Sequence, residues 1–174
     1  LAPAEAAIRL RQCHFAFFFA AKYHPAFRHI GPARRLCADR GQRTIFNLLG
    51  PLLNPAEPTA QLVGVARPDL CEKMGRVLQS LGLRRVIIVS GAISHGAGEV
   101  SHFDEFATLG ENTVAELYQS RAFAVSTLSP DQFPVQAAVL ADLRGGDAQE
   151  NAGIVRRILH GDERGPKRDA VLLN

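Results

Sequence analysis

The sequence predicts an α/β fold, a single α/β domain with a mostly buried mixed sheet flanked by helices. Residues 61–65 (QLVGV) and 85–89 (RVIIV) are apolar runs of strand length, and the second is typical of a strand covered on both faces. Between them the apolar residues have helical spacing, and a hairpin pattern follows. Strands that alternate with helices in this way indicate a layered α/β domain.

The segment before these strands contains a helix and a further strand. Residues 3–12 (PAEAAIRLRQ) have the spacing of an amphipathic helix, and residues 15–19 (FAFFF) form a continuous apolar run. We therefore expect residues 15–19 to be a short, fully buried strand.

The helix between the two apolar strands is expected to start at Pro68 and Asp69 and to end at Gly82, a favoured C-cap residue. Its apolar face consists of Leu70, Met74, Val77, Leu78 and Leu81. After the strand at 85–89, residues 90–98 (SGAISHGAG) are expected to form a loop of small residues.

The last third of the chain predicts a hairpin and two helices. The segments NTVAELY and RAFAVSTL indicate two strands joined near Gln119 and Ser120. A helix is expected to follow the N-cap Asp147 and to end at Gly161, and another to start around Pro166.

Composition restricts the class of protein. A chain of 174 residues that is 47% hydrophobic can bury a substantial core. Its net charge of +3 favours anionic small ligands at least as readily as nucleic acid. No apolar run approaches the roughly 18 residues of a membrane span, and no signal-like segment is present, so we expect no membrane association.

The cysteines and the chain ends carry two further expectations. Cys13, Cys37 and Cys71 have no CxxC spacing, which indicates a reducing, cytoplasmic setting without a zinc ribbon. Because the chain starts at Leu1 without Met and stops at VLLN within a predicted helix, we expect residues 1–174 to be one domain of a longer protein, truncated at both ends.

A cluster of basic residues follows the aromatic run: Arg28, Arg34, Arg35, Arg40 and Arg43, with His24 and His29 beside them. If Pro25 opens a helix, Arg28, Arg35 and His24 share a face, and Arg34 projects about 100° away from Arg35. A guanidinium group is a planar fork of donors that matches a carboxylate or phosphate, so the cluster indicates anion recognition. A solvated basic helix face is the alternative interpretation.

A Gly-Pro step interrupts the apolar segment LLGPLLNP. Gly50 and Pro51 predict a rigid turn, and Asn54 before Pro55 predicts another bend. The segment forms either the wall of a pocket or an ordinary structural turn.

Adjacent carboxylates in SHFDEFATLG form a second candidate centre. Asp104 and Glu105 can face one cation if they lie on a loop, and such oxygen ligands suit Mg²⁺ bridged to substrate phosphates. An ordinary surface dipeptide is the alternative, and Glu99 and Glu111 are nearby carboxylates of the same kind. His95 and His102 have no metal-ligand spacing and are expected to be loop residues.

Several motifs of covalent catalysis and phosphate binding are missing from the sequence. It contains no G-x-S-x-G elbow, P-loop or Rossmann fingerprint, so no catalytic residue is expected to act as a covalent nucleophile.

The motifs resemble the C-terminal part of the anthranilate phosphoribosyltransferase family. The matching segments are FFFAAKYHPAFRHIGPARR, RTIFNLLGPLLNPA, QLVGV, the Asp-Glu pair in HFDEFATLGENTVAEL, LRGGDAQENA and RDAVLLN, in this order. Members of the family transfer a 5-phosphoribosyl group from its diphosphate (PRPP) to the amine of anthranilate, a step of tryptophan biosynthesis. The resemblance implies an α/β domain that is joined in the family to a helical N-terminal part.

The resemblance also implies a role for several residues. The anthranilate-binding arginine of the family matches Arg34, and the pocket residues match His24, Phe27, Gly50 and Pro51. The Mg²⁺-binding pair matches Asp104 and Glu105. Arg34 would then pair with the carboxylate of anthranilate, and the cofactor Mg²⁺ would neutralise the departing diphosphate. Catalysis would consist of positioning and electrostatic stabilisation.

The chain departs from the family pattern in several places. The family's glycine-rich phosphate loop and Lys-His-Gly-Asn segment would lie upstream of Leu1, so we expect the chain alone to be inactive. Ala21 and Ala107 replace a Pro and a Ser that are common in the family, and the link Leu36–Gln42 is longer. These differences affect the detailed shape of the pocket.

Two other functions compete with this one. The basic cluster would fit a catalytically inactive relative of the same fold that binds nucleic acid, with binding that weakens steeply as salt rises. A pyrimidine nucleoside phosphorylase of similar fold matches the motifs less well. The resemblance further implies a homodimer for the complete enzyme.

Overall fold

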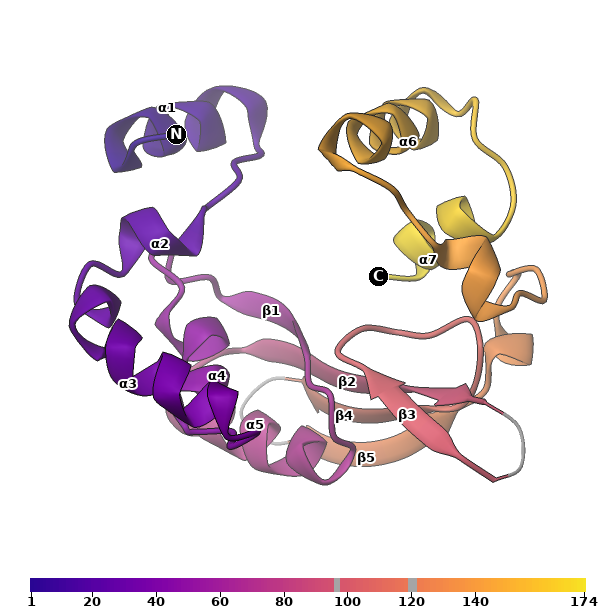
Figure 1. The fold of residues 1–174 in the computed structure, drawn as a ribbon, viewed down its shortest axis with the longest axis horizontal. Helices are drawn as coiled ribbons and strands as arrows, with labels where there is room; N and C mark the ends of the chain where they lie inside the picture. Colours follow the sequence, from indigo (N-terminus) through magenta and orange to yellow (C-terminus); the bar gives the residue numbers. More distant parts are fainter. Residues whose placement is uncertain (96–97, 119–121) are drawn as a thin grey trace. The chain divides into compact units, whose positions relative to one another are not determined.

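The computed structural model describes residues 1–95, 98–118 and 122–174. The chain divides into two compact units, Leu1–Glu57 and Pro58–Asn174. The first unit is helical, and the second contains the sheet (Figure 1). The expectation that residues 1–174 form one domain stays a prediction.

The first unit is a series of short helices. They are α1 (Pro3–Cys13), α2 (Ala20–Tyr23), α3 (Phe27–Asp39) and α4 (Phe46–Leu49), followed by the 3-10 helix η1 (Gly50–Leu53). Helix α1 confirms the helix predicted over residues 3–12. It begins with a proline, whose missing N–H costs nothing in the first turn, and the Glu5 carboxylate accepts a hydrogen bond from the Ala2 amide at 2.8 Å.

The strand predicted over residues 15–19 is wrong. The segment links α1 to α2 without regular structure, and Phe15, Phe17 and Phe19 are 73%, 68% and 55% exposed. Every strand in the described part of the chain belongs to Pro58–Asn174, so the run finds no ladder partner within its own unit. Phe18 packs against Tyr23 instead, with ring centroids 5.0 Å apart.

The second unit is built on a mixed sheet. Its strands in the described residues are β1 (Ala60–Gly64), β2 (Arg85–Ser94), β3 (Val100–Phe103), β4 (Asn112–Tyr118) and β5 (Ala122–Leu128). The order is β1-β2-β4-β5, and β3 also pairs with β2. Only the β1–β2 pair is parallel among the described strands. The mixed sheet, its first strand and the β4–β5 hairpin are therefore confirmed; the turn near Gln119 and Ser120 lies outside the described residues.

Strand β2 is longer than the sequence predicts. Residues 90–94, expected to be loop, continue the strand. Ser90 pairs with Thr113 of β4, and β3 pairs with residues 91–94, from Gly91 opposite Phe103 to Ser94 opposite Val100. The expectation that His102 is a loop residue is wrong for the same reason, since His102 lies in β3.

The two faces of β2 are covered by different segments. Helix α5 (Asp69–Ser80) packs on the face that carries Ile88, because a Cβ added to Gly75 would lie 3.7 Å from the Ile88 side chain. Gly91 points to the opposite face, where a Cβ would lie 2.6 Å from Ala107. The loop after β3 therefore crosses the sheet on the side away from α5 (Figure 1).

The core of the second unit lies between α5 and the central strands. Leu78, Val86, Ile88 and Leu117 are among its fully buried side chains. Burial raises the pKa of the Cys71 thiol to about 11, and the thiol donates a weak hydrogen bond to the Thr113 carbonyl at 3.4 Å. Cys71 is thus a protonated packing residue at neutral pH.

The chain ends in helices that confirm the predictions. The Asp147 carboxylate accepts hydrogen bonds from two amides of the first turn of α6 (Ala148–His160), and Gly161 ends the helix with a φ of 81°. Short 3-10 helices, η2 (Pro130–Gln132) and η3 (Leu140–Leu143), precede α6, and α7 (Pro166–Leu173) follows it. In the described part of the chain, no helix combines the length and apolar character needed to cross a membrane.

Candidate functional site

Helix α3 separates the basic cluster into two faces. Its less exposed positions are Phe27, Ile30, Gly31, Arg34 and Cys37, which recur at the spacing of one helix face. The other arginines of the helix, at positions 28 and 35, are exposed. Arg34 is therefore the arginine of α3 that lies on the partly covered face. The expectation that His24 shares a helix face with Arg28 is wrong, because α3 begins at Phe27.

Phe27 connects two parts of the first unit. Its ring lies 5.3 Å from the His24 ring and 6.4 Å from the Phe46 ring, measured between centroids. Phe46 begins α4, and α4 leads directly into Gly50 and Pro51. Within the described residues, these ring contacts join His24, Phe27 and Phe46, and Gly50 and Pro51 follow Phe46 in the chain, whereas Arg34 is linked to Phe27 only by its position on the same face of α3. The rigid turn predicted at Gly50–Pro51 is a continuation of α4 as a 3-10 helix.

Neither the backbone conformation at Gly50 nor the packing of the described residues around it requires a glycine at this position. Its φ of −51° and ψ of −54° suit any residue, and a Cβ there would meet nothing within 4 Å. The described residues therefore place no other protein atom within 4 Å of a Cβ at Gly50.

The Arg34 guanidinium forms no ion pair and no hydrogen bond within the described residues. A partly covered cation without an internal carboxylate can still pair with an anionic ligand.

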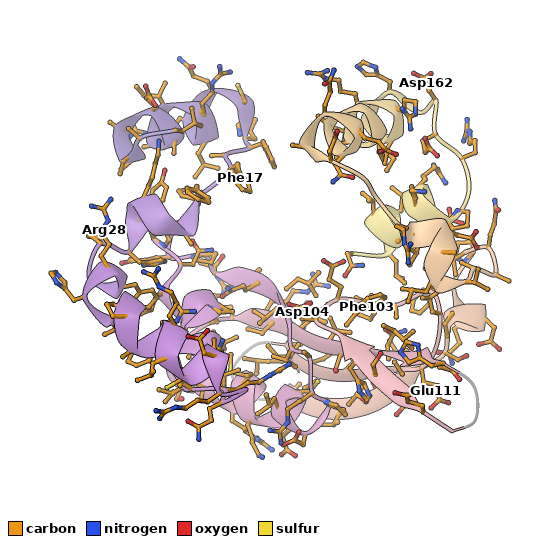
Figure 2. All side chains as sticks on the ribbon, viewed as in Figure 1. Phe17, Arg28, Phe103, Asp104, Glu111 and Asp162 are labelled. Atoms are coloured by element: carbon orange, nitrogen blue, oxygen red, sulfur yellow. The ribbon has the colours of Figure 1, made fainter. Side chains whose placement is uncertain are left out.

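Asp104 and Glu105 lie on the loop that follows β3, and both are exposed. Figure 2 labels Asp104 on this loop. Neither carboxylate forms an ion pair or side-chain hydrogen bond within the described residues. Both line two neighbouring hollows of the second unit, of about 400 Å³ and about 410 Å³. The first hollow is bounded by α6 and α7, and the second by β1, β2 and α7.

Two glycines that the sequence analysis did not single out bring this loop onto the sheet. A Cβ at Gly64 would collide with the backbone carbonyl of Asp104, and a Cβ at Gly91 would lie 2.6 Å from the carbonyl oxygen of Glu105. Real Cβ atoms do not approach backbone so closely, so the strands must be bare at these positions. Gly64 lies within a predicted strand and offered a sequence signal, whereas Gly91 falls in the segment 90–98 that was expected to be loop.

The donor set of the loop fits Mg²⁺ in part. In the described residues, no group of three or more His, Cys, Asp or Glu side chains could hold a metal, so the protein offers no closed cage there. Mg²⁺ is usually held by one or two carboxylates together with water and substrate phosphates, and Asp104 with Glu105 supplies such a pair. Glu99 and Glu111 do not line either hollow.

The two candidate centres differ in charge and lie in different compact units. The Arg34 centre offers a guanidinium on the same face of α3 as Phe27, and a guanidinium suits a planar carboxylate. The Asp104–Glu105 centre offers acceptor oxygens beside a hollow, suited to a hydrated cation. Together they provide groups for two unlike ligands.

Comparison of the sequence with known families identifies one class of protein. A model described as "Glycosyl transferase family, a/b domain" matches residues 1–174. The chain belongs to this glycosyl transferase family.

Similar proteins have a more particular name. The chain is 40% identical over 165 residues to anthranilate phosphoribosyltransferase of Herpetosiphon aurantiacus, covering 95% of the chain and 46% of that protein. It is 46% identical over 166 residues to the enzyme of the same name from Geobacter sp., covering 95% of the chain and 43% of that protein.

A solved structure agrees in fold. The crystal structure of anthranilate phosphoribosyltransferase from Thermus thermophilus matches with a TM-score of 0.77 at 38% identity, covering 98% of this chain and 46% of that one. The chain thus spans about half the length of the curated relatives it matches.

Proposed function

We propose that the chain is the acceptor-binding and metal-binding portion of an anthranilate phosphoribosyltransferase. The complete enzyme would transfer the 5-phosphoribosyl group of PRPP to the amine of anthranilate in tryptophan biosynthesis. A bond forms between the amine nitrogen and C1 of the ribose, the bond from C1 to diphosphate breaks, and the amine loses a proton. The observation that carries the proposal is Arg34, unpaired within the described residues, on the partly covered face of α3 with Phe27.

Arg34 is the residue for the acceptor. Its guanidinium would pair with the carboxylate of anthranilate, and the His24 and Phe27 rings would contact the aromatic ring. Gly50 and Pro51 would complete the wall, where the open space beside Gly50 leaves room for the ligand. This geometry would direct the amine of anthranilate towards PRPP without a protein nucleophile.

Asp104 and Glu105 are the residues for the metal. When bound, Mg²⁺ would neutralise charge on the departing diphosphate. The two carboxylates lie at the edge of two hollows and form no ion pair within the described residues, although Lys167 also lines the first hollow. We further propose a cytoplasmic homodimer for the complete enzyme; free cysteines at positions 13, 37 and 71 fit the reducing compartment.

The test uses the full-length protein and the fluorescence of anthranilate. We expect fluorescence to fall when PRPP is added with Mg²⁺, and to stay constant when EDTA replaces Mg²⁺. Asp104→Asn with Glu105→Gln should raise the Mg²⁺ concentration required for half-maximal rate. No fall in fluorescence from a folded protein would overturn the proposed reaction, and a rate indifferent to the double substitution would overturn the metal role.

A nucleic-acid-binding function is the second candidate, because Arg28, Arg35, Arg40 and Arg43 are all exposed. Its signature would be binding to duplex DNA that weakens steeply between low and moderate salt. Such binding in a protein without transferase activity would favour the inactive relative over the enzyme.

A further inference from the structure

Two asparagine side chains form hydrogen bonds with the backbone directly after the Asp104–Glu105 pair. The Asn174 amide accepts a hydrogen bond from the Phe106 N–H at 2.8 Å and donates one to the Phe106 carbonyl at 3.0 Å. The Asn112 amide does the same for the next residue, accepting from the Ala107 N–H at 2.7 Å and donating to the Ala107 carbonyl at 3.0 Å. Each amide thus satisfies both backbone groups of one residue, as a neighbouring strand would.

The two asparagines are anchored in different elements. Asn112 is the first residue of β4 and is fully buried. Asn174 follows α7, is exposed, and also donates to the Ala170 carbonyl at 3.0 Å. The sheet and α7 therefore hold consecutive loop residues. Neither asparagine can be recognised from the sequence, because an amide that contacts backbone leaves no spacing signal.

The glycines of β1 and β2 complete this support. Gly64 and Gly91 allow the carbonyls of Asp104 and Glu105 to lie against the sheet, so the loop is bounded by the sheet and fastened by two amides. The carboxylates themselves form no hydrogen bond within the described residues, so the position of the backbone at Asp104 and Glu105 determines where the two side chains can lie. Metal affinity depends strongly on groups that orient the ligands without touching the metal.

We propose that Asn174 is a positioning residue for the metal-binding pair, fastening the Asp104–Glu105 loop to the segment that contains α7. The proposal rests on the proposed metal role of Asp104 and Glu105. Loss of the Asn174 amide would free Phe106 and let both carboxylates sample positions that cannot hold one ion. Asn174 suits a test better than Asn112, because removal of a buried amide would leave several backbone groups unsatisfied.

The test compares Asn174→Ala with Asn151→Ala in the full-length protein. Asn151 is a matched control: its amide also spans one residue, accepting from the Gly146 N–H at 3.0 Å and donating to the Gly146 carbonyl at 2.9 Å. It lines the same hollow as Asp104 but holds a different loop. Hydrogen exchange of residues 103–109 measures how firmly Asn174 holds the loop. Binding of Mn²⁺ alone, followed by its paramagnetic signal, measures the metal affinity of the site.

We expect Asn174→Ala to speed exchange in residues 103–109 and to weaken Mn²⁺ binding about tenfold, while Asn151→Ala changes neither quantity. The KM for anthranilate should stay unchanged, whereas general loosening of the protein would alter it as well. Asn174→Ser, whose side chain is too short to span both groups, should give the same results if the alanine variant is unstable.

Three outcomes overturn the inference in distinguishable ways. Unchanged exchange would show that Asn174 does not hold the loop. Faster exchange with unchanged Mn²⁺ binding would show that the loop does not set the site. Equal Mn²⁺ binding by the wild type and by the protein with Asp104→Asn and Glu105→Gln would remove the proposed metal role, and the inference with it.

Discussion

Arg34 and Arg35 are adjacent and equally charged, yet α3 presents them differently. Arg34 lies on the partly covered face, and Arg35 is exposed. We expect Arg34→Ala to raise the KM for anthranilate by about 10- to 100-fold, because a hydrogen-bonded charge pair contributes roughly 1.5–3 kcal/mol. The measurement is steady-state kinetics of the full-length protein at saturating PRPP.

Arg35→Ala is the control for that prediction. It removes the same charge from the neighbouring position, so it should change the KM for anthranilate by no more than about twofold. Equal effects of the two substitutions would mean that the field of the cluster, and not one guanidinium, attracts the acceptor.

The sequence predicted individual residues well where chemistry depends on neighbours along the chain. Asp104 and Glu105 are adjacent, so their position on one exposed loop could be predicted. The supporting residues could not, because Asn174 meets Phe106 across 68 residues, and only the fold brings them together. The open space at Gly50 likewise depends on what packs near it.

At the level of elements, β2 has no side chain at Gly91, where the Asp104–Glu105 loop lies against it, and this leads to a prediction about stability. Gly91→Ala would place a methyl group 2.6 Å from the Glu105 carbonyl oxygen and from the Ala107 Cβ. We expect a loss of about 1–3 kcal/mol in the free energy of unfolding, because backbone cannot move aside as a side chain can. Urea denaturation measures this change.

Gly153→Ala is the contrasting change. Gly153 lies inside α6, and a Cβ there would meet only the far end of the Arg157 side chain, at 3.5 Å. We expect this change to stabilise the protein by about 0.5–1 kcal/mol, since alanine favours the helix. A stabilising Gly91→Ala would show that the loop can move away from the sheet at little cost.

Elements with strong local signals were predicted, and those that depend on distant partners were not. Helix α6 has an N-cap aspartate and a C-terminal glycine, and both act as the sequence indicates. The end of β2 depends on β3, whose four residues have no alternating pattern. Residues 15–19 have an apolar pattern but no ladder partner in their unit, so composition alone misassigned them.

At the scale of the whole molecule, the buried apolar side chains are unevenly divided. Ala6 is the buried apolar residue of Leu1–Glu57 in the described chain; the others lie in Pro58–Asn174. We expect residues 58–174 to unfold cooperatively when expressed alone, and residues 1–57 to show no cooperative transition, because cooperativity needs a core. Thermal melts followed by circular dichroism compare the two pieces. A cooperative transition in residues 1–57 would contradict this expectation.

The contact between Asn174 and Phe106 also affects the order in which parts of the second unit fold and open. Strands β2 to β5 are joined by short connections and can pair early, whereas this contact must close 68 residues of chain. Among the described residues, α7 does not belong to the ladders of the sheet, so it can open without breaking them. We therefore expect the carboxylate loop to become ordered last in folding and to be released first in the native state. The lifetime of an organised metal site would then be set by α7, and it would be much shorter than the lifetime of the fold.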